Sequence, residues 1–291
     1  MKLPKPLSFL LRAAITAGAA YLAFSQVSLQ QVLPLLRRIP AAYLLAALIL
    51  VHVGQFISAL RTRYYLHCQG IDLPVDPSVR LHYVGGLFNV FLPGGAGGDV
   101  YKAWWLKRHK QGALLSMAKV MIASRLNGLW ALGILICLLG LLSDDILRLH
   151  AQAPWLIVVA AIAGTIGYSI LARLILKEPF TQQRQAGLYS LLLQLMLVGA
   201  SAVLCVGLGQ QDHVLEYVVL FLLSCMLAML PVSIGGIGVR ELALLHGSRL
   251  LGLSEETGVT LAFSYTLLTL TIALVGMVIH HCYAPEQEKQ A

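Results

Sequence analysis

Long apolar runs alternate with short polar segments along the chain. A helix needs roughly 20 apolar residues to cross the hydrocarbon core of a bilayer. Six runs are long enough, and they cover approximately residues 7–26, 41–60, 112–142, 154–176, 186–208 and 257–282. The hydrophobic pattern therefore predicts about six full membrane spans.

Two further apolar runs, residues 79–92 and 214–230, are shorter. At about 1.5 Å per residue they reach roughly 21–26 Å, whereas the hydrocarbon core is about 30 Å thick. Each ends in a break rich in glycine, and a second short segment follows it, at residues 99–110 and 239–252. Each pair of segments is therefore predicted to enter the membrane and return to the same side.

The complete pattern predicts an all-α integral membrane domain over residues 1–284 and a polar C-terminal tail over residues 285–291. Two re-entrant broken-helix hairpins lie within the domain, at about residues 79–110 and about residues 214–252. Three predicted crossings separate the hairpins, so they enter from opposite faces and form inverted repeats. Broken helices arranged in this way are typical of the substrate sites of transporters.

The two breaks are similar in sequence and align without a gap. The first is Leu92-Pro-Gly-Gly-Ala-Gly-Gly-Asp-Val-Tyr-Lys-Ala103, and the second is Leu230-Pro-Val-Ser-Ile-Gly-Gly-Ile-Gly-Val-Arg-Glu241. They share the Leu-Pro pair, a Gly-Gly pair and a basic residue at the eleventh position. Each break ends where a short helix is predicted to begin, so free N–H groups and the positive ends of two helix dipoles favour an anion there.

Composition places the chain among polytopic membrane proteins, because 58% of its residues are hydrophobic and only 12% are charged. The net charge of +8 does not indicate nucleic-acid binding, since the basic residues lie between apolar runs. Most of the 21 Lys and Arg residues fall on one side if both termini are cytoplasmic. The sequence therefore predicts a multi-pass protein of the cytoplasmic (inner) membrane with both termini inside.

Charged residues within the apolar segments are the strongest functional candidates, because a charge at membrane depth is costly. Arg125 lies about 20 Å along its predicted helix, and a structural pair with Asp99 is the alternative to a role in binding. Asp99 also fits a helix N-cap, and Asn89 fits a partner for carbonyl groups freed at the break. The predicted substrate-binding residues are Asn89, Gly94, Gly95, Gly97, Gly98, Asp99, Lys102, Arg125, Ser233, Gly235, Gly236, Arg240 and Glu241.

The sequence predicts no catalytic residue, no metal site and no cofactor. No Ser/His pair or paired carboxylates at workable spacing occur, and no Gly-Lys-[Ser/Thr] follows the glycines as in a nucleotide-binding loop. Five histidines lack an acid at helical spacing, so we interpret them as boundary or cavity-lining residues. They are His52, His67, His82, His280 and His281.

Three segments resemble the transmembrane region of bacterial lysyl-phosphatidylglycerol synthases and its stand-alone relatives. They are Asn89 to Ala103 with its Leu-Pro-Gly-Gly-Ala-Gly-Gly-Asp core, Ser124-Arg125-Leu126, and Leu230 to Glu241. In the fused enzymes this region is similar to a lipid flippase, so the resemblance implies lipid translocation here as well. The chain lacks the aminoacyl-transferase domain, and lysyl transfer is therefore not implied.

The expected function is that of a flippase or transporter for a phospholipid or another lipid with a polar headgroup. The headgroup, anionic or zwitterionic, is expected between the two hairpin tips, while the acyl chains remain in the bilayer. The expected partners are such membrane lipids, with a homo-oligomer or a lipid-synthase partner as further possibilities and no nucleic acid. An integral-membrane enzyme or an accessory subunit in the synthesis of lipids or lipid-linked glycans is the alternative.

Overall fold

The computed structural model describes residues 29–91, 97–110, 114–174, 177, 180–229 and 236–288. These residues form helices and connecting turns, with no strand among them, so the predicted all-α class is confirmed. The helices are α2 (Leu29–Arg38), α3 (Ala41–Cys68), α4 (Val75–Phe91), α5 (Gly97–Lys110), α6 (Leu114–Gly140), α7 (Asp144–Arg148), α8 (Ala153–Leu174), α9 (Phe180–Gly207), α10 (Val214–Ala228), α11 (Val239–Leu250) and α12 (Glu255–Glu288).

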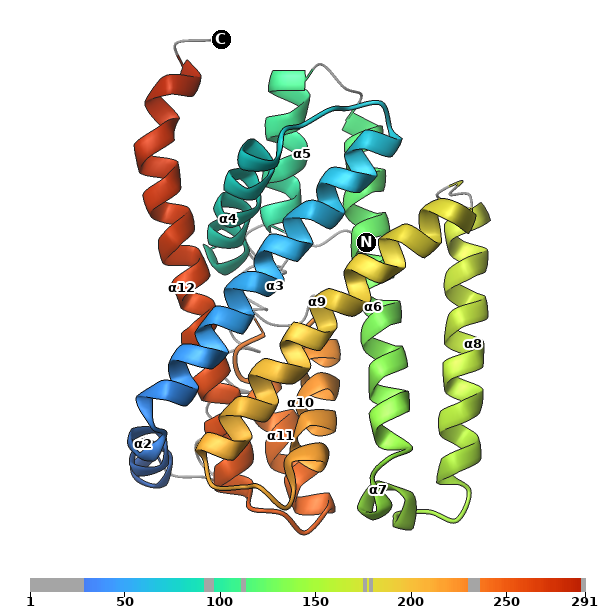
Figure 1. Ribbon diagram of the computed structural model, residues 1–291, viewed down its shortest axis with the longest axis vertical. Coiled ribbons are helices and arrows are strands. Elements are labelled where there is room, and N and C mark those ends of the chain that lie inside the picture. The colour runs from blue at the N-terminus through green and yellow to red at the C-terminus, as the bar shows by residue number, and fades with distance from the viewer. Residues whose placement is uncertain are drawn as a thin grey trace, which may run out of the picture.

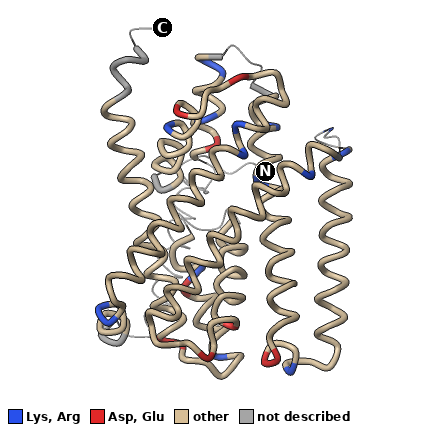
Figure 2. The backbone as a smooth tube through the Cα atoms, viewed as in Figure 1, with Lys and Arg blue, Asp and Glu red and all other residues tan. Residues whose placement is uncertain are grey.

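Five helices in the described part of the chain, α3, α6, α8, α9 and α12, are long and apolar enough to cross a membrane. They correspond to five of the six predicted spans, and the remaining one, residues 7–26, lies outside the described residues. Between their ends α8 and α12 carry no charged residue (Figure 2). Many large apolar side chains of these helices point outward, as expected for helices that face lipid.

Several helices extend beyond the apolar runs that predict them. α3 continues to Cys68 rather than ending near residue 60, and α9 begins at Phe180 rather than near residue 186. The added residues are polar but compatible with a helix, so hydropathy alone does not detect them. α12 continues through Glu288, which makes the first residues of the predicted polar tail helical.

The two short helix pairs lie at opposite ends of the molecule (Figure 1). α4 packs against α5, and α10 packs against α11. The C-terminal ends of α4 and α10 and the N-terminal ends of α5 and α11 point toward the middle of the molecule (Figure 1). α4 has 17 residues and α10 has 15, so both are shorter than a typical membrane span.

The remaining helices hold these pairs in place. α3 packs along α9, α12 packs against both α4 and α11, and α6 contacts α5, α8, α9 and α10. The largest apolar core lies among α3, α6 and α9–α12 and includes Leu132, Leu204, Tyr217, Phe221 and Leu261. α12 and α6 therefore connect the two helix pairs.

Close contact between α4 and α12 depends on Gly276. A Cβ atom at this position would overlap the backbone carbonyl oxygen of Tyr83 on α4. Gly276→Ala is therefore expected to lower the free energy of unfolding by about 1–3 kcal/mol, as overpacking does elsewhere. Gly164→Ala on α8 is the control, since no atom lies within 4 Å of its Cβ position. Equilibrium unfolding in one detergent tests this prediction, and equal stabilities would contradict the close crossing.

Candidate functional site

The first short helix pair positions Asp99 near the middle of the fold. α5 begins at Gly97, so Asp99 lies in its first turn rather than at the predicted N-cap. The amide of Gly98 donates a hydrogen bond of 2.8 Å to Oδ1 of Asn89. Asn89 thus satisfies a free N–H at the start of α5.

Small residues bring α5 close to α4 at this point. Gly98 faces Gly85, and a Cβ atom on Gly98 would overlap the Gly85 carbonyl oxygen. Gly85 in turn faces the aliphatic part of Lys102, where an added Cβ atom would lie 2.6 Å from Cε. The two backbones and the Lys102 side chain therefore fit only because both positions are glycine.

The carboxylate of Asp99 binds two cations. Nε of Arg125, on α6, donates to Oδ2 at 2.5 Å, and Nζ of Lys102 lies 3.5 Å from Oδ1. Lys102 is buried, whereas Arg125 and Asp99 keep part of their side chains exposed, 36% and 20%. The structure thus contains both the Asp99–Arg125 pair and the local Asp99–Lys102 pair that the spacing predicts.

Two residues outside the predicted substrate-binding set, His82 and Arg61, complete this region. The ammonium group of Lys102 lies 3.3 Å from Nδ1 of His82, so Nδ1 is the acceptor. In a neutral imidazole the other ring nitrogen, Nε2, then carries the proton and donates to Gln55 at 3.0 Å. Arg61 on α3 is buried, donates to Ser190 at 2.7 Å and interacts electrostatically with Asp99. Its Nε atom has no hydrogen-bond partner among the described residues.

We call Asp99, Arg61, Lys102 and Arg125 the Asp99 cluster. Within it Lys102 and Arg125 contact the Asp99 carboxylate and Arg61 lies within electrostatic range of it, so positive charges outnumber the described acids. Burying an uncompensated charge is costly, and a bound anion would offset that cost. The cluster therefore has the electrostatic character of a site for a phosphate or carboxylate.

The second helix pair presents a different arrangement. Gly238 has a φ of 81°, which favours glycine, and its amide donates at 2.7 Å to the carboxylate of Glu241 three residues later. Arg240 is buried, donates to Thr266 on α12 at 3.0 Å and lies over the ring of Tyr265. Glu241 therefore accepts a hydrogen bond from a backbone N–H at the start of α11, and Arg240 links the start of α11 to α12.

The predicted site residues thus fall into two groups. Asn89, Gly97, Gly98, Asp99, Lys102 and Arg125 gather where α4, α5 and α6 meet. Gly236, Arg240 and Glu241 gather at the start of α11 beside α12. Gly94, Gly95, Ser233 and Gly235 lie outside the described residues.

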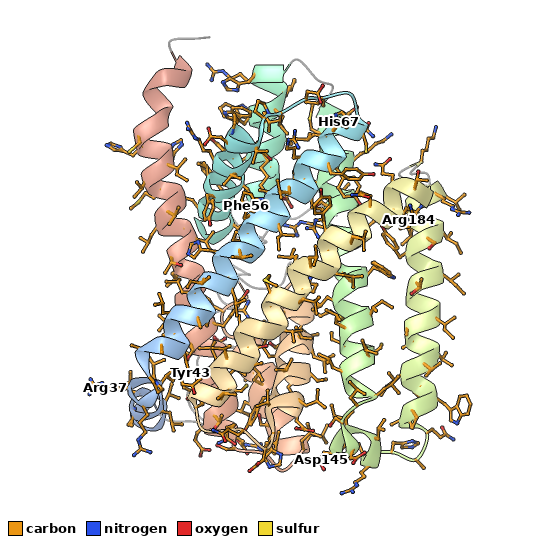
Figure 3. All side chains as sticks on the ribbon, in the orientation of Figure 1. Arg37, Tyr43, Phe56, His67, Asp145 and Arg184 are labelled. Carbon is orange, nitrogen blue, oxygen red and sulfur yellow. The ribbon has the colours of Figure 1, made fainter. Side chains whose placement is uncertain are left out.

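One further group of residues in the described part of the chain could hold a metal ion. Ligand atoms of Asp145, His213 and Glu216 lie within 4.8 Å of one another, at the end of the molecule where Figure 3 labels Asp145. Ser143, the N-cap of α7, also donates to Glu216 at 2.6 Å. The sequence analysis predicts no metal here, because the two segments are far apart in the chain.

Comparison with protein families agrees with this architecture. A search of curated proteins finds no match. The family model for the lysylphosphatidylglycerol synthase TM region matches residues 9–185 and 180–276, nearly the whole chain. The chain therefore belongs to the family of lysylphosphatidylglycerol synthase transmembrane regions.

Proposed function

We propose that this protein is a lipid flippase that moves a lipid with an anionic or zwitterionic headgroup across the cytoplasmic membrane. Membership of the family links the chain to lipid metabolism or transport in a membrane. The observation that carries the proposal is the charge of the Asp99 cluster, in which two cations contact one carboxylate and a third lies within electrostatic range of it. The phosphate of the headgroup would supply the missing negative charge.

The position of the cluster supports transport rather than simple binding. Asp99 lies in the first turn of α5, whose N-terminal end points toward the middle of the molecule (Figure 1). The start of α11, with Arg240, points there from the opposite end (Figure 1). We propose that the two pairs are inverted re-entrant hairpins and that the headgroup passes between their tips, reached from each side in turn.

The orientation that we propose places both termini in the cytoplasm. Lys and Arg are denser over the upper half of the molecule in Figure 2, where α12 ends. An excess of these residues marks the cytoplasmic side of a membrane protein.

Translocation in proteoliposomes tests the proposed function directly. Purified protein would be reconstituted with fluorescent phosphatidylglycerol, phosphatidate, phosphatidylethanolamine or phosphatidylcholine, and inward movement measured by protection from dithionite. We expect wild type to move lipids selectively by headgroup, and Arg125→Ala to lose at least about tenfold in rate, the effect of about 1.4 kcal/mol on the barrier. Lys119→Ala, on the same helix, should retain the wild-type rate.

Two results would contradict the proposal. Folded wild type that moves no lipid in this panel would favour an enzyme or an accessory subunit instead. Equal movement by wild type and Arg125→Ala would separate transport from the Asp99 cluster.

A further inference from the structure

A cavity of about 550 Å³ lies between α6, α8 and α10. Its walls are almost entirely apolar and include Trp130, Gly133, Gly164, Gly167, Tyr168 and Met226. The volume lies within the roughly 300–1,000 Å³ that sites for small molecules occupy. We call it the lateral cavity, because α8 lies at the side of the bundle in Figure 1.

Glycines on α8 leave this space open. No atom lies within 4 Å of a Cβ atom built on Gly164 or Gly167. They therefore do not serve a close helix contact, which is the usual reason for glycine in membrane helices. Tyr168 and Ala172 are the buried residues of α8, so the helix touches the bundle mainly through a narrow stripe.

The lateral cavity has one polar edge. The ring of Tyr168 stacks on Trp130 with centroids 5.3 Å apart, and its hydroxyl accepts a hydrogen bond of 2.6 Å from Asn127. The hydroxyl of Ser190 donates to Asn127 and accepts from Arg61 at 2.7 Å. A hydrogen-bonded chain therefore connects the cavity wall with a cation of the Asp99 cluster.

A second connection runs along α6. Leu126 lines the lateral cavity and follows Arg125, which binds Asp99. One helix thus presents a cation to the polar site and apolar side chains to the cavity. A ligand that uses both must be polar at one end and hydrocarbon at the other.

We propose that the lateral cavity binds one hydrocarbon chain of the lipid whose phosphate occupies the Asp99 cluster. The inference rests on the proposed function for the headgroup, but it adds a tail site that the sequence does not predict. The apolar walls match a saturated or prenyl chain, and Tyr168 and Trp130 lie where hydrocarbon gives way to the polar group. Such amphipathic rings commonly occupy boundaries of this kind.

Photo-crosslinking tests the tail site. Wild type would be incubated in detergent with phosphatidylglycerol that carries a diazirine at the middle of one acyl chain, and labelled peptides identified by mass spectrometry. We expect the label on α6 and α8 residues that line the cavity. Gly167→Phe should lower this labelling roughly tenfold, the loss expected when about two methylene groups no longer reach an apolar site.

The matched control is Ile166→Phe, because Ile166 is adjacent on α8 but 55% exposed. It should leave the labelling of the cavity unchanged. Equal labelling in both variants, or a label spread over outward-facing residues, would overturn the inference and indicate ordinary bilayer lipid. Equal labelling by diazirine-diacylglycerol, which lacks phosphate, would overturn the link to the Asp99 cluster.

Failure of the inference and failure of the proposed function give different results. Cavity labelling by a protein that moves no lipid would keep the tail site and reject translocation. Headgroup-selective translocation without cavity labelling would keep the flippase and reject the tail site.

Discussion

Replacing Asp99 by asparagine is expected to lower the free energy of unfolding by about 3 kcal/mol, the lower end of the cost of breaking a buried ion pair. The carboxylate accepts from Arg125 at 2.5 Å and lies 3.5 Å from the Lys102 ammonium group. An amide leaves these cations and Arg61 without the negative charge that offsets them. We use the lower end of this range of free-energy costs because 20% of the Asp99 side chain is exposed, so the ion pair is only partly buried. Equilibrium unfolding by dodecyl sulfate in mixed micelles measures the change.

Asp76→Asn is the matched control for this substitution. Asp76 pairs with Arg80 one turn along α4 at 2.7 Å, but the Asp76 side chain is 67% exposed, whereas that of Asp99 is 20% exposed. Such an exposed pair contributes about 0.3–0.5 kcal/mol. If Asp99→Asn is no less stable than Asp76→Asn, the charge balance inferred for the Asp99 cluster is wrong.

The hydrophobic pattern predicts which segments form helices better than it predicts where they end. It finds the five described spans because each is long and apolar enough to cross a membrane. It misses the last turns of α3, since polar residues such as Arg63 and His67 continue the helix beyond the apolar run. It also misses α2 and α7, which are too short to give a membrane signal.

Three of the four residues of the Asp99 cluster are visible in the sequence for a simple physical reason. Asp99, Lys102 and Arg125 stand out because charged residues within apolar segments are costly. Arg61 does not, because it lies just past the apolar run 41–60 and resembles a residue at the membrane boundary. Only the longer α3 and its packing against α6 bring Arg61 into the interior.

Glu241 is the reverse case, because the sequence selects it as a site residue and the structure shows a local contact for it. Its place in the second break makes it one of the predicted substrate-binding residues. In the structure its carboxylate accepts from the Gly238 amide, and it is 1% exposed. The contact satisfies a backbone N–H at the start of α11, and this gives the acid a structural role.

Replacing Arg61 by methionine is expected to stabilise the protein while weakening its binding of anionic lipid. The guanidinium group is buried and, within the described part of the chain, its Nε has no hydrogen-bond partner. An apolar side chain therefore removes a desolvated charge from a cluster with excess cations. We expect a gain of about 1 kcal/mol in the free energy of unfolding. Affinity for phosphatidylglycerol should fall roughly tenfold, as for a loss of about 1.4 kcal/mol.

Opposite changes in stability and affinity distinguish a binding residue from a structural one, because removing an arginine that supports the fold lowers the free energy of unfolding. Unfolding by dodecyl sulfate and native mass spectrometry with short-chain phosphatidylglycerol give the two quantities. Arg63→Met is the matched control, since Arg63 is two residues away on α3 but exposed, and donates to the carbonyl of Leu73 at 2.7 Å. It should leave lipid affinity unchanged. If Arg61→Met loses stability and keeps its lipid affinity, Arg61 supports the fold and the anion site must be formed without it.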